Sequence, residues 1–428
     1  MAKIAFIGAG SVVFSKQLMS DLLRHPELAE STIALMDIDG GRLDTARKVG
    51  EGFARQFAPG ARVEATLDRR EALCDADYVI NMVQVGVHEA TLKDFAIPRK
   101  YGPRQTIADT LGVGGIFRAL RTIPVVRGIV EDMEAVAPDA ILLNYTNPMA
   151  MLCLAVFKTS GAPTVGLCHS VQHTSQQLAE YAGLPYDEVS YRVAGINHMA
   201  WFLEFKHNGR DAYPLLRRAA EDEAIVAKDR VRFEMMRRLG YFVTESSEHF
   251  SEYVPYFIPH AGHIERFDVP IDEYIRRSEE NLREFDEVRR LVEEGGSPEV
   301  EEGVEYASGI ILAMETGRPY AFNGNVYNRG LITNLPADCC VEVPCLIDKN
   351  GVQPTVVGDL PPQLAALDRT NINVQQLTVE AALTGKRAHV YHAAMLDPLA
   401  AATLTLDQIW AMCDDLIEAH GDLLPPLH

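Results

Sequence analysis

The sequence predicts an α/β protein in which an N-terminal Rossmann-like, doubly wound parallel sheet is followed by a mixed α+β domain. Three observations lead to this expectation. Apolar, strand-like stretches alternate with amphipathic, helix-like stretches in the first half of the chain, as in a parallel sheet covered on both faces. A glycine turn follows the first apolar stretch. The alternation ends near residue 190, so we expect domains over residues 1–190 and 191–428.

The elements of the first half follow from their hydrophobic periodicity. Strands are expected where short apolar runs end at polar or glycine residues, and helices where apolar residues recur every three or four positions. The expected strands are residues 3–8, 32–37, 77–83, 140–145 and 164–168, and the expected helices are residues 14–26, 42–57 and 122–138.

The second half has a different pattern. Residues 191–196 and 200–205 favour antiparallel strands, and residues 272–294 form a long charged helix. Residues 318–347 return to short strands between Asn and Gly turns, and helices are expected from residue 362 onward. This order predicts an α+β domain over the second half of the chain.

Composition and charge exclude several kinds of partner. The formal net charge of -20 argues against nucleic acid and anionic membranes, because phosphate binding needs clustered Lys and Arg. The chain shows no apolar run long enough to span a bilayer, and it begins with a strand rather than a secretory leader. Seven cysteines without a disulfide-like spacing indicate a reducing compartment, so we expect a cytoplasmic protein.

The segment GAGS at residues 8–11 ends the first expected strand and predicts a dinucleotide site. Gly8 allows the tight turn, Gly10 lets the backbone approach a pyrophosphate, and Ser11 leads into a helix whose N-terminus favours an anion. Val13 stands where the full fingerprint has its third glycine, a change that need not abolish binding.

Polar residues at later strand ends fit the same site. Asp37 ends the second expected strand and can accept hydrogen bonds from an adenosine ribose, which favours NAD over NADP. It follows Gly10 by 27 residues, somewhat more than the usual spacing of about 20. Asn81 and Gln84 lie at the carboxyl edge of the expected sheet, where ligands collect. A glycine turn in an ordinary α/β protein is the alternative, and the combination of features favours NAD.

A cysteine and a histidine at two further strand ends suggest a metal site. Cys168 ends the expected strand over residues 164–168, and His198 follows the expected strand over residues 191–196. A thiolate and an imidazole brought together can hold a borderline divalent ion, and two protein ligands leave positions open for substrate or water. The residues alone leave another reading open, because a free cysteine is commonly a small core residue.

Four motifs, in chain order, resemble glycoside hydrolase family 4, whose members are glycosidases that depend on NAD and a divalent metal ion. The motifs are GAGS at residues 8–11, NYTNPMAML at 144–152, GLCHSVQ at 166–172 and AGINHMAWFLEF at 194–205. The resemblance extends from Lys3 to about Phe257 and more weakly to the end of the chain. CHSV together with GINHMA resembles most the α-galactosidase (melibiase) branch.

The resemblance implies roles for single residues. Cys168 and His198 would be the metal ligands, with Mn²⁺ the usual ion, and Asn147 would bind substrate hydroxyls. Tyr253, in the segment SEYVPYF, would be the catalytic base, with Tyr256 as the fallback.

The general acid is less directly implied. Relatives that act on 6-phosphosugars often carry an Asp directly after the cysteine as the acid, and this chain has His169 there. Either His169 or a water molecule that it holds is therefore the expected acid.

The resemblance also implies the reaction, which is the cleavage of terminal α-galactosides. NAD⁺ takes a hydride from C3 of the sugar, the base removes the C2 proton, the leaving group departs from C1, water adds and the hydride returns. The metal ion stabilises the charge that develops at the C2 and C3 oxygens. It would also favour the phenolate of Tyr253, since a free tyrosine has a pKa of about 10.

Other functions remain as alternatives at this point. α-Glucosidases and α-uronidases share the frame, and one or two pocket residues decide between these sugars. A malate- or lactate-type dehydrogenase would need no metal, and a non-catalytic NAD-binding sensor would show no metal dependence.

Two further expectations concern a loop and assembly. Residues 109–122, DTLGVGGIFRALRT, are expected to form a mobile loop beside the sugar pocket, with Arg118 or Arg121 available for contacts. Members of the family assemble into dimers or tetramers, so the resemblance implies a homodimer or homotetramer.

Overall fold

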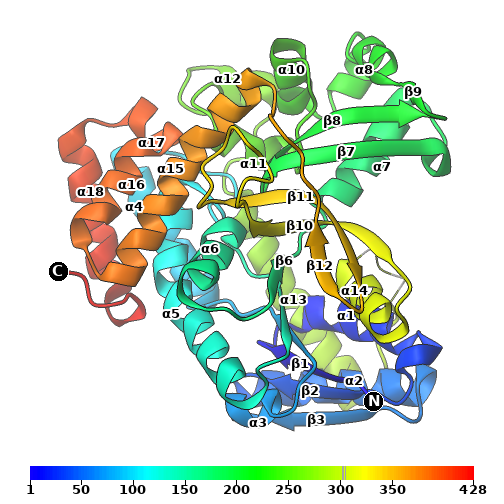
Figure 1. The fold of residues 1–428 in the computed structure, drawn as a ribbon. Helices are drawn as coiled ribbons and strands as arrows, with labels where there is room; N and C mark the ends of the chain where they lie inside the picture. The colour runs from blue at the N-terminus through cyan, green and yellow to red at the C-terminus, as the bar shows by residue number, and fades with distance from the viewer. Residues whose placement is uncertain (301–302, 304) are drawn as a thin grey trace.

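The computed structural model describes residues 1–300, 303 and 305–428, and one twelve-stranded sheet runs through it (Figure 1). The strands are β1 (Lys3–Ile7), β2 (Thr32–Met36), β3 (Arg62–Thr66), β4 (Tyr78–Asn81), β5 (Ile141–Asn144), β6 (Thr164–Gly166), β7 (Val189–Ile196), β8 (Met199–His207), β9 (Arg210–Asp211), β10 (Tyr320–Tyr327), β11 (Cys340–Asp348) and β12 (Gly351–Pro354). Their order is β3-β2-β1-β4-β5-β6-β10-β11-β7-β8-β9, and β12 pairs with β11.

The first six strands confirm the predicted fold class. They are parallel, and the order 3-2-1-4-5-6 is that of a doubly wound Rossmann sheet. β1 and β2 are buried along most of their length because helices cover both faces. β3 was not expected from the sequence, because it is an edge strand whose mostly exposed side chains carry no apolar run.

Helices cover this sheet and build the rest of the molecule. They are α1 (Val12–Leu23), α2 (Gly40–Phe57), α3 (Arg69–Leu73), α4 (Val87–Tyr101), α5 (Gly112–Val136), α6 (Met149–Thr159), α7 (Ser170–Ala182), α8 (Tyr213–Ala219), α9 (Glu223–Val226), α10 (Arg230–Leu239), α11 (Ser247–Glu252), α12 (His263–Phe267), α13 (Glu273–Glu293), α14 (Tyr306–Thr316), α15 (Pro362–Thr384), α16 (Arg387–Leu396), α17 (Pro398–Thr403) and α18 (Leu406–His420). Local capping fixes several starts: Asp39 accepts two backbone N–H bonds at α2, and Thr405 and Gln408 form a capping box at α18.

The sheet continues across the expected domain boundary. β6 pairs with β10 at Gly166 and Asn325, and β11 pairs with β7 at Glu342 and Gly195. The strands after residue 190 are antiparallel, as the sequence suggested. The two halves therefore share one sheet, and the boundary at residue 190 stays a prediction.

One expectation about the chain was wrong. Most of the glycine-rich segment over residues 109–122 is the first part of α5 rather than a mobile loop. Its glycines serve close packing: a Cβ at Gly114 would lie 2.8 Å from the side chain and the backbone oxygen of Ala108. A Cβ at Gly115 would lie 2.8 Å from the backbone of Thr110. Glycine there allows a helix to approach a preceding turn, which composition alone does not distinguish from flexibility.

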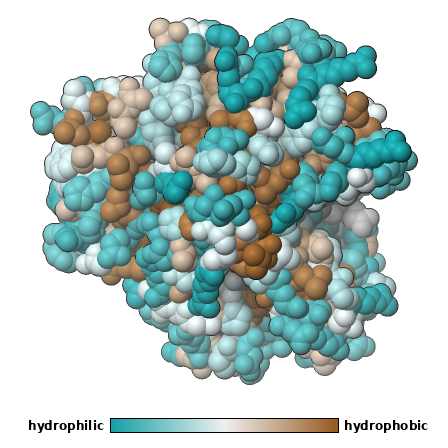
Figure 2. All heavy atoms as spheres, turned by 45° about the horizontal axis from the view of Figure 1, so that its top comes forward, coloured by the Kyte–Doolittle hydropathy of each residue, from teal (hydrophilic) through white to brown (hydrophobic). Residues whose placement is uncertain are grey.

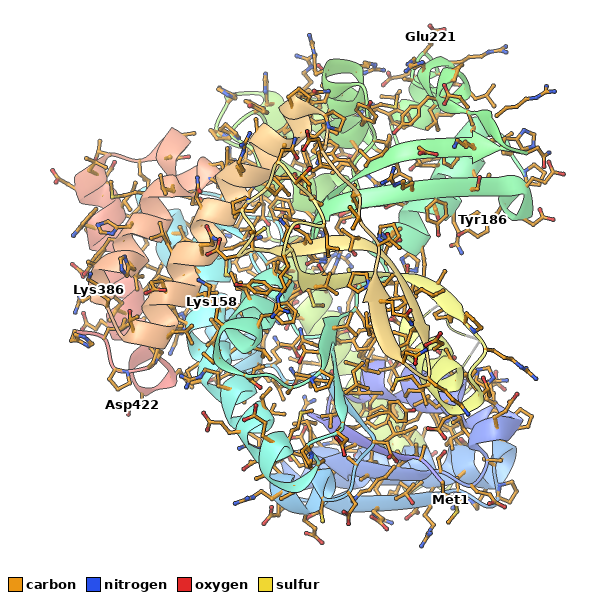
Figure 3. The ribbon with its side chains drawn as sticks, viewed as in Figure 1. Met1, Lys158, Tyr186, Glu221, Lys386 and Asp422 are labelled. Carbon is orange, nitrogen blue, oxygen red and sulfur yellow. The ribbon has the colours of Figure 1, made fainter. Side chains whose placement is uncertain are left out.

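The C-terminal helices α15 to α18 pack beside α4, α5 and α6, at the left of Figure 1. Figure 3 places Lys386 and Asp422 on this bundle, and Tyr186 and Glu221 at the opposite side, near β7, β8 and α8. The face in Figure 2 is mostly hydrophilic, with hydrophobic side chains gathered in separate patches. None of the helices in the described part of the chain is long and apolar enough to cross a membrane.

A buried ion pair between α4 and α5 also contacts the end of α18. Arg121 of α5 donates two hydrogen bonds to Asp94 of α4, at 3.2 and 2.6 Å. His420, at the end of α18, lies 2.9 Å from the same carboxylate, and its ring stacks on Phe117. All three polar side chains are nearly inaccessible to water, so each depends on the others for hydrogen bonds.

We predict that Asp94→Asn lowers the free energy of unfolding by about 3–5 kcal/mol, because it leaves the Arg121 charge buried without its carboxylate. Urea denaturation followed by circular dichroism measures the change. The control is Glu180→Gln, which removes an exposed ion pair with Lys228 and should cost less than about 1 kcal/mol. Equal effects of the two substitutions would contradict the assignment.

Candidate functional site

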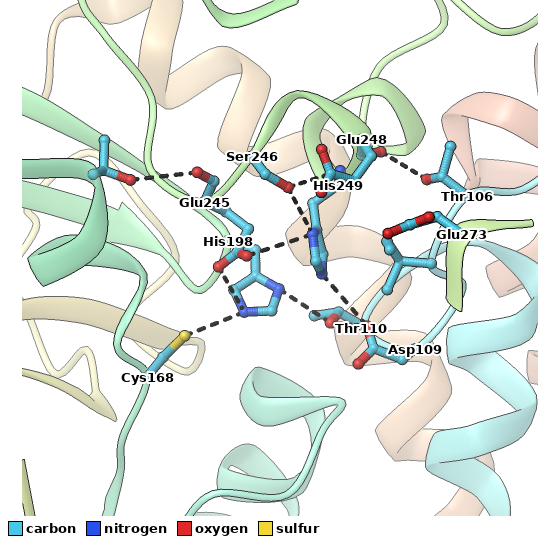
Figure 4. A network of polar contacts seen from close by, with 12 residues as sticks. Thr106, Asp109, Thr110, Cys168, His198, Glu245, Ser246, Glu248, His249 and Glu273 are labelled. Atoms are coloured by element: carbon cyan, nitrogen blue, oxygen red, sulfur yellow. Dashed lines mark hydrogen bonds and ion pairs between the residues drawn. The ribbon is translucent and has the colours of Figure 1, made fainter. Parts of the chain in front are cut away.

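Three potential metal ligands converge beside the carboxyl edge of the Rossmann sheet (Figure 4). Cys168 Sγ lies 3.3 Å from His198 Nε2, and Glu245 Oε2 lies 3.4 Å from the same nitrogen. One ligand atom from each residue falls within 4.8 Å of the other two. The sequence had proposed Cys168 and His198, and the structure brings them together and adds Glu245.

Each of the three candidate ligands lies within two residues of the end or the start of a regular element. Cys168 lies two residues beyond the end of β6, His198 lies in the tight turn between β7 and β8, and Glu245 precedes α11. His198 has φ +63° and Glu245 has φ +73°. Residues other than glycine rarely adopt this backbone conformation, which costs about 1–3 kcal/mol and persists only where the surrounding structure holds it.

Protonation states in the cluster suit a divalent cation. Burial lowers the pKa of His198 to about 4, so the imidazole is neutral at pH 7. Burial acts to raise the pKa of Glu245, but the nearby His198 and His249 outweigh it and hold that pKa at about 2. Burial, with the charges of Glu245 and Glu342, raises the pKa of the Cys168 thiol. A cation at this place could bind the neutral imidazole nitrogen of His198, the carboxylate of Glu245 and the sulfur of Cys168, whose proton it would displace.

The second nitrogen of His198 faces a tyrosine. His198 Nδ1 lies 3.2 Å from Tyr253 Oη and 3.2 Å from Thr110 Oγ1. Tyr253 is almost completely buried, and burial with the charge of Asp109 raises its pKa. Tyr256 is 48% exposed, so the structure brings Tyr253 and not Tyr256 to the cluster.

A second layer of polar side chains surrounds the ligands. Asn147 Nδ2 donates to Asp109 Oδ2 at 3.0 Å, and Thr110 Oγ1 donates to Asp109 Oδ1 at 2.7 Å. His249 lies between two acids, with Nδ1 3.5 Å from Glu245 Oε1 and Nε2 3.9 Å from Asp109 Oδ1. Sequence reasoning missed Asp109, Glu245 and His249, although the run of acids and a histidine in TESSEHFSEY, just before Tyr253, was a usable signal.

His169 stands at the start of α7, directly after Cys168 in the chain, and is half-buried. Its Nδ1 lies 3.1 Å from Glu305 Oε1, and its ring centroid lies 4.6 Å from that of His173. Burial acts to lower the pKa of His169, but the hydrogen bond and charge of Glu305 more than offset this and raise it. The contact through Nδ1 leaves Nε2 for another partner.

At the turn over Gly8 and Gly10 the chain passes close to neighbouring segments. Gly8 has φ +89°, and a Cβ there would lie 2.9 Å from the backbone of Val83. Gly10 N–H donates to Asp37 Oδ2 at 2.8 Å, and a Cβ on Gly10 would lie 2.6 Å from that oxygen. Glycine is required at both positions because the chain passes so close to its neighbours.

The surface beside this turn is hollowed. A cleft there is lined by Ser11 and Val13 of the turn and first helix, by Gln84, and by Ser278 and Phe285 of α13, among others. The N-terminus of α1 opens onto it and favours a pyrophosphate.

Asn81 and the two arginines have other partners. Asn81 is completely buried, and its Nδ2 donates to Asn144 Oδ1 at 2.8 Å. Arg121 is bound to Asp94, as described above. Arg118 donates from Nε to the backbone oxygen of Asn147 at 3.2 Å, so it contacts the sugar-site candidate through the main chain.

The chain is similar to known proteins over nearly its whole length. A model described as family 4 glycosyl hydrolase matches residues 3–184, and a model of the C-terminal domain of that family matches residues 193–400. An α-galactosidase of Bacillus subtilis (strain 168) is 49% identical over 429 residues, which cover 99% of each chain. An α-galactosidase of Rhizobium meliloti (strain 1021) is 38% identical over 443 residues, which cover 99% of this chain and 89% of that protein.

A solved structure shares the fold. A 6-phospho-α-glucosidase from gut microorganisms, in complex with NAD and Mn²⁺, superimposes with a TM-score of 0.83. Its sequence is 20% identical, and the match covers 99% of each chain.

We predict that Glu245→Gln weakens Mn²⁺ binding by at least about tenfold, because an amide replaces the one carboxylate of the cluster. Titration calorimetry with Mn²⁺ alone measures the dissociation constant. The matched control is Glu248→Gln, one turn further along, whose carboxylate contacts Arg277 instead. Unchanged affinity in Glu245→Gln would rule out Glu245 as a ligand.

A buried acid beside the cluster gives a prediction for pH dependence. Glu342 of β11 is completely buried, and neither carboxylate oxygen has a hydrogen-bond partner within the described residues. Burial, together with Glu245, raises its pKa from 4.5 to about 8. Since the unfolded chain ionises first, the native state loses stability as the pH rises from 4.5 toward 8, by up to about 1.4 kcal/mol per pH unit.

Glu342→Gln cannot ionise and should remove this dependence. Thermal unfolding of both proteins between pH 5 and pH 8 should show the variant gaining stability relative to the unmodified chain as the pH rises. A stability difference that stays constant with pH would show that Glu342 does not titrate in this window.

Proposed function

The chain belongs to family 4 of the glycosyl hydrolases, and from this we propose that it is an α-galactosidase that uses NAD and a divalent metal ion, with Mn²⁺ the first candidate. The observation that carries the proposal is the cluster of Cys168, His198 and Glu245 beside Tyr253. The alternative of a malate- or lactate-type dehydrogenase does not account for a family match that extends through residues 193–400. The related structure with NAD and Mn²⁺ supports the choice of cofactors.

NAD would bind at the cleft lined by Ser11, Val13 and Gln84, next to the turn at Gly8 and Gly10, and the cluster of three candidate ligands would hold the metal ion. The chemistry supplied by these groups when bound is hydride exchange at C3 of the sugar and stabilisation of negative charge on the neighbouring oxygens. The remaining steps are proton transfers and substrate positioning, which fall to side chains of this chain.

Tyr253 is the proposed base that removes the C2 proton. When Nε2 of His198 is a metal ligand, its proton resides on Nδ1, which lies 3.2 Å from Tyr253 Oη. A hydrogen bond donated to the phenolate favours the ionised form and opposes the effect of burial on the tyrosine pKa. His198 therefore has two roles in the proposal, one through each ring nitrogen.

His169 is the proposed acid at the leaving-group oxygen. Glu305 holds Nδ1 at 3.1 Å, which would orient Nε2 toward a ligand, as a carboxylate orients histidine in many catalytic sites. Asn147 is the proposed contact to sugar hydroxyls, and its amide is oriented by the bond from Nδ2 to Asp109.

The charges around the cluster support a neutral sugar over a uronide. Two acids, Asp109 and Glu245, have their pKa values held below the usual range, so both are ionised at pH 7. Arg118 donates to Asn147 O and Tyr274 Oη, and Arg232 pairs with Asp229. A sugar carboxylate would meet these acids and would need a cation already engaged elsewhere.

A cytoplasmic location and a homodimer or homotetramer complete the proposal. The proposed location rests on the cysteine spacing in the sequence, which suggests no disulfide framework. The assembly state is carried over from the resemblance to the family, and size-exclusion chromatography with light scattering tests it.

The function is tested by incubating the protein with NAD⁺ and Mn²⁺ under reducing conditions and supplying nitrophenyl α-galactoside, α-glucoside, α-glucuronide and α-galacturonide in turn. We expect nitrophenol release from the galactoside without stoichiometric NADH, and its loss on treatment with EDTA. Faster release from another glycoside would reassign the sugar, and NADH accumulation with malate would favour the dehydrogenase.

Tyr253→Phe should lower kcat by roughly 100- to 10,000-fold, the usual contribution of a general base. The control is Tyr256→Phe, which removes a hydroxyl from an exposed ring and should leave kcat within about twofold. Steady-state kinetics at saturating NAD⁺ and Mn²⁺ give both values. Comparable turnover in the two variants would mean that Tyr253 is not the base.

A further inference from the structure

A buried carboxylate next to the candidate base accepts hydrogen bonds from three successive backbone N–H groups. Glu252 is the last residue of α11 and is 2% exposed. Its Oε1 accepts from Thr106 N at 2.6 Å and from Ile107 N at 3.2 Å, and its Oε2 accepts from Ala108 N at 3.0 Å. Glu252 has no place in the proposed proton transfers, so these contacts need another explanation.

The backbone that Glu252 holds is strained. Ala108 has φ +54°, a conformation that an alanine adopts at a cost of about 1–3 kcal/mol. Two further bonds hold the turn: Thr106 O accepts from Tyr274 N of α13 at 2.9 Å, and Thr106 Oγ1 donates to Glu248 O of α11 at 2.7 Å. Such a turn persists only where its surroundings over-determine it.

The held turn leads directly into the candidate site. Asp109 follows Ala108 and accepts the Asn147 amide, and Thr110 Oγ1 lies 3.2 Å from His198 Nδ1. Tyr253 follows Glu252 and lies 3.2 Å from the same nitrogen. Two neighbouring residues at the end of α11 therefore have different contacts. Tyr253 is the candidate base, and Glu252 holds the turn that precedes Asp109 and Thr110.

We propose that Glu252 is a positioning residue for the reaction: its carboxylate clamps residues 106–108 and so places Asp109 and Thr110 against Asn147 and His198. This inference rests on the proposed function for its effect on turnover. Its effects on the turn and on metal binding do not depend on which sugar the enzyme cleaves.

Glutamine is the sharpest replacement because it has the same size but only one acceptor oxygen. If the amide nitrogen of glutamine replaces Oε2, it cannot accept from Ala108 N–H. If the amide is flipped so that the nitrogen replaces Oε1, it cannot accept from the N–H groups of Thr106 and Ile107. At least one buried donor then loses its partner, which favours release of the turn. Burial raises the pKa of Glu252 to about 7, so the experiment is run at pH 8, where the carboxylate is ionised.

The experiment compares the unmodified chain, Glu252→Gln and the control Glu265→Gln, whose side chain is exposed on α12. Three quantities are measured on the full chain: hydrogen exchange of peptides covering residues 105–110, the Mn²⁺ dissociation constant without sugar, and kcat with nitrophenyl α-galactoside. Glu252→Asp is made in parallel, because it keeps the charge but is one methylene too short to reach all three donors.

We expect Glu252→Gln to speed exchange in residues 105–110 while the strands β1, β4 and β5 stay protected. Mn²⁺ affinity should fall about tenfold, since Thr110 no longer orients His198. Turnover should fall about 100-fold, the usual effect of displacing catalytic groups by about 1 Å. Glu252→Asp should fall between Glu252→Gln and the unmodified chain, and Glu265→Gln should match the unmodified chain.

Two results would overturn the proposal. Unchanged exchange in residues 105–110 would show that Glu252 does not hold the turn. Faster exchange throughout the chain would assign Glu252 a general structural role. If the unmodified chain cleaves none of the glycosides, the proposed function fails, while the exchange and Mn²⁺ measurements still decide on Glu252.

Discussion

The site depends on one constraint, the convergence of a thiol, an imidazole and a carboxylate in a place that water barely reaches. Cys168 and His198 follow strands β6 and β7, which β10 and β11 separate in the sheet. β6 meets β10 at Gly166 and Asn325, and β7 meets β11 at Gly195 and Glu342, whereas β10 and β11 pair along their length. A Cβ at Gly166 would lie 2.9 Å from Asn325 Cβ of β10, and a Cβ at Gly195 would lie 2.7 Å from Ala200 Cα of β8. The missing side chains let the strands approach closely, and the two strand ends can then reach one point.

Burial also sets the electrostatics of that point. A carboxylate removed from water is costly unless a cation or hydrogen-bond donors compensate it. Glu245 lies beside the rings of His198 and His249, and Arg232 donates to its backbone oxygen rather than to its carboxylate. Asp109 has donors from Asn147 and Thr110. A divalent cation would complete this compensation, which explains why so many acids can share one small, water-poor region.

The polar side chains that surround the cluster orient its functional groups more than they stabilise the fold. His198 is fixed through Nδ1, Asn147 through its amide, and His169 through Glu305. Close packing does comparable work at the main chain, since Gly114 and Gly115 let α5 pack directly against the turn before it. A reaction with several proton transfers needs each donor and acceptor held to a fraction of an ångström, and rigid partners supply that precision.

The sequence by itself determined the Rossmann half, because buried parallel strands are continuous apolar runs and the turn at Gly8 and Gly10 has strict local requirements. It also identified the family and named Cys168, His198 and Tyr253 as candidates. Only the tertiary structure brought in Glu245, Asp109 and Glu252, whose partners at the site lie from 38 to 146 residues away in the chain. The tertiary structure also showed that residues 112–122 are helical. The sequence could not show this, because a glycine-rich segment can be either flexible or closely packed, and the residues that lie against it decide which. The preference of a segment for helix, strand or turn depends on residues that are neighbours in the sequence. The contacts that orient a site join segments that only the folded chain brings together.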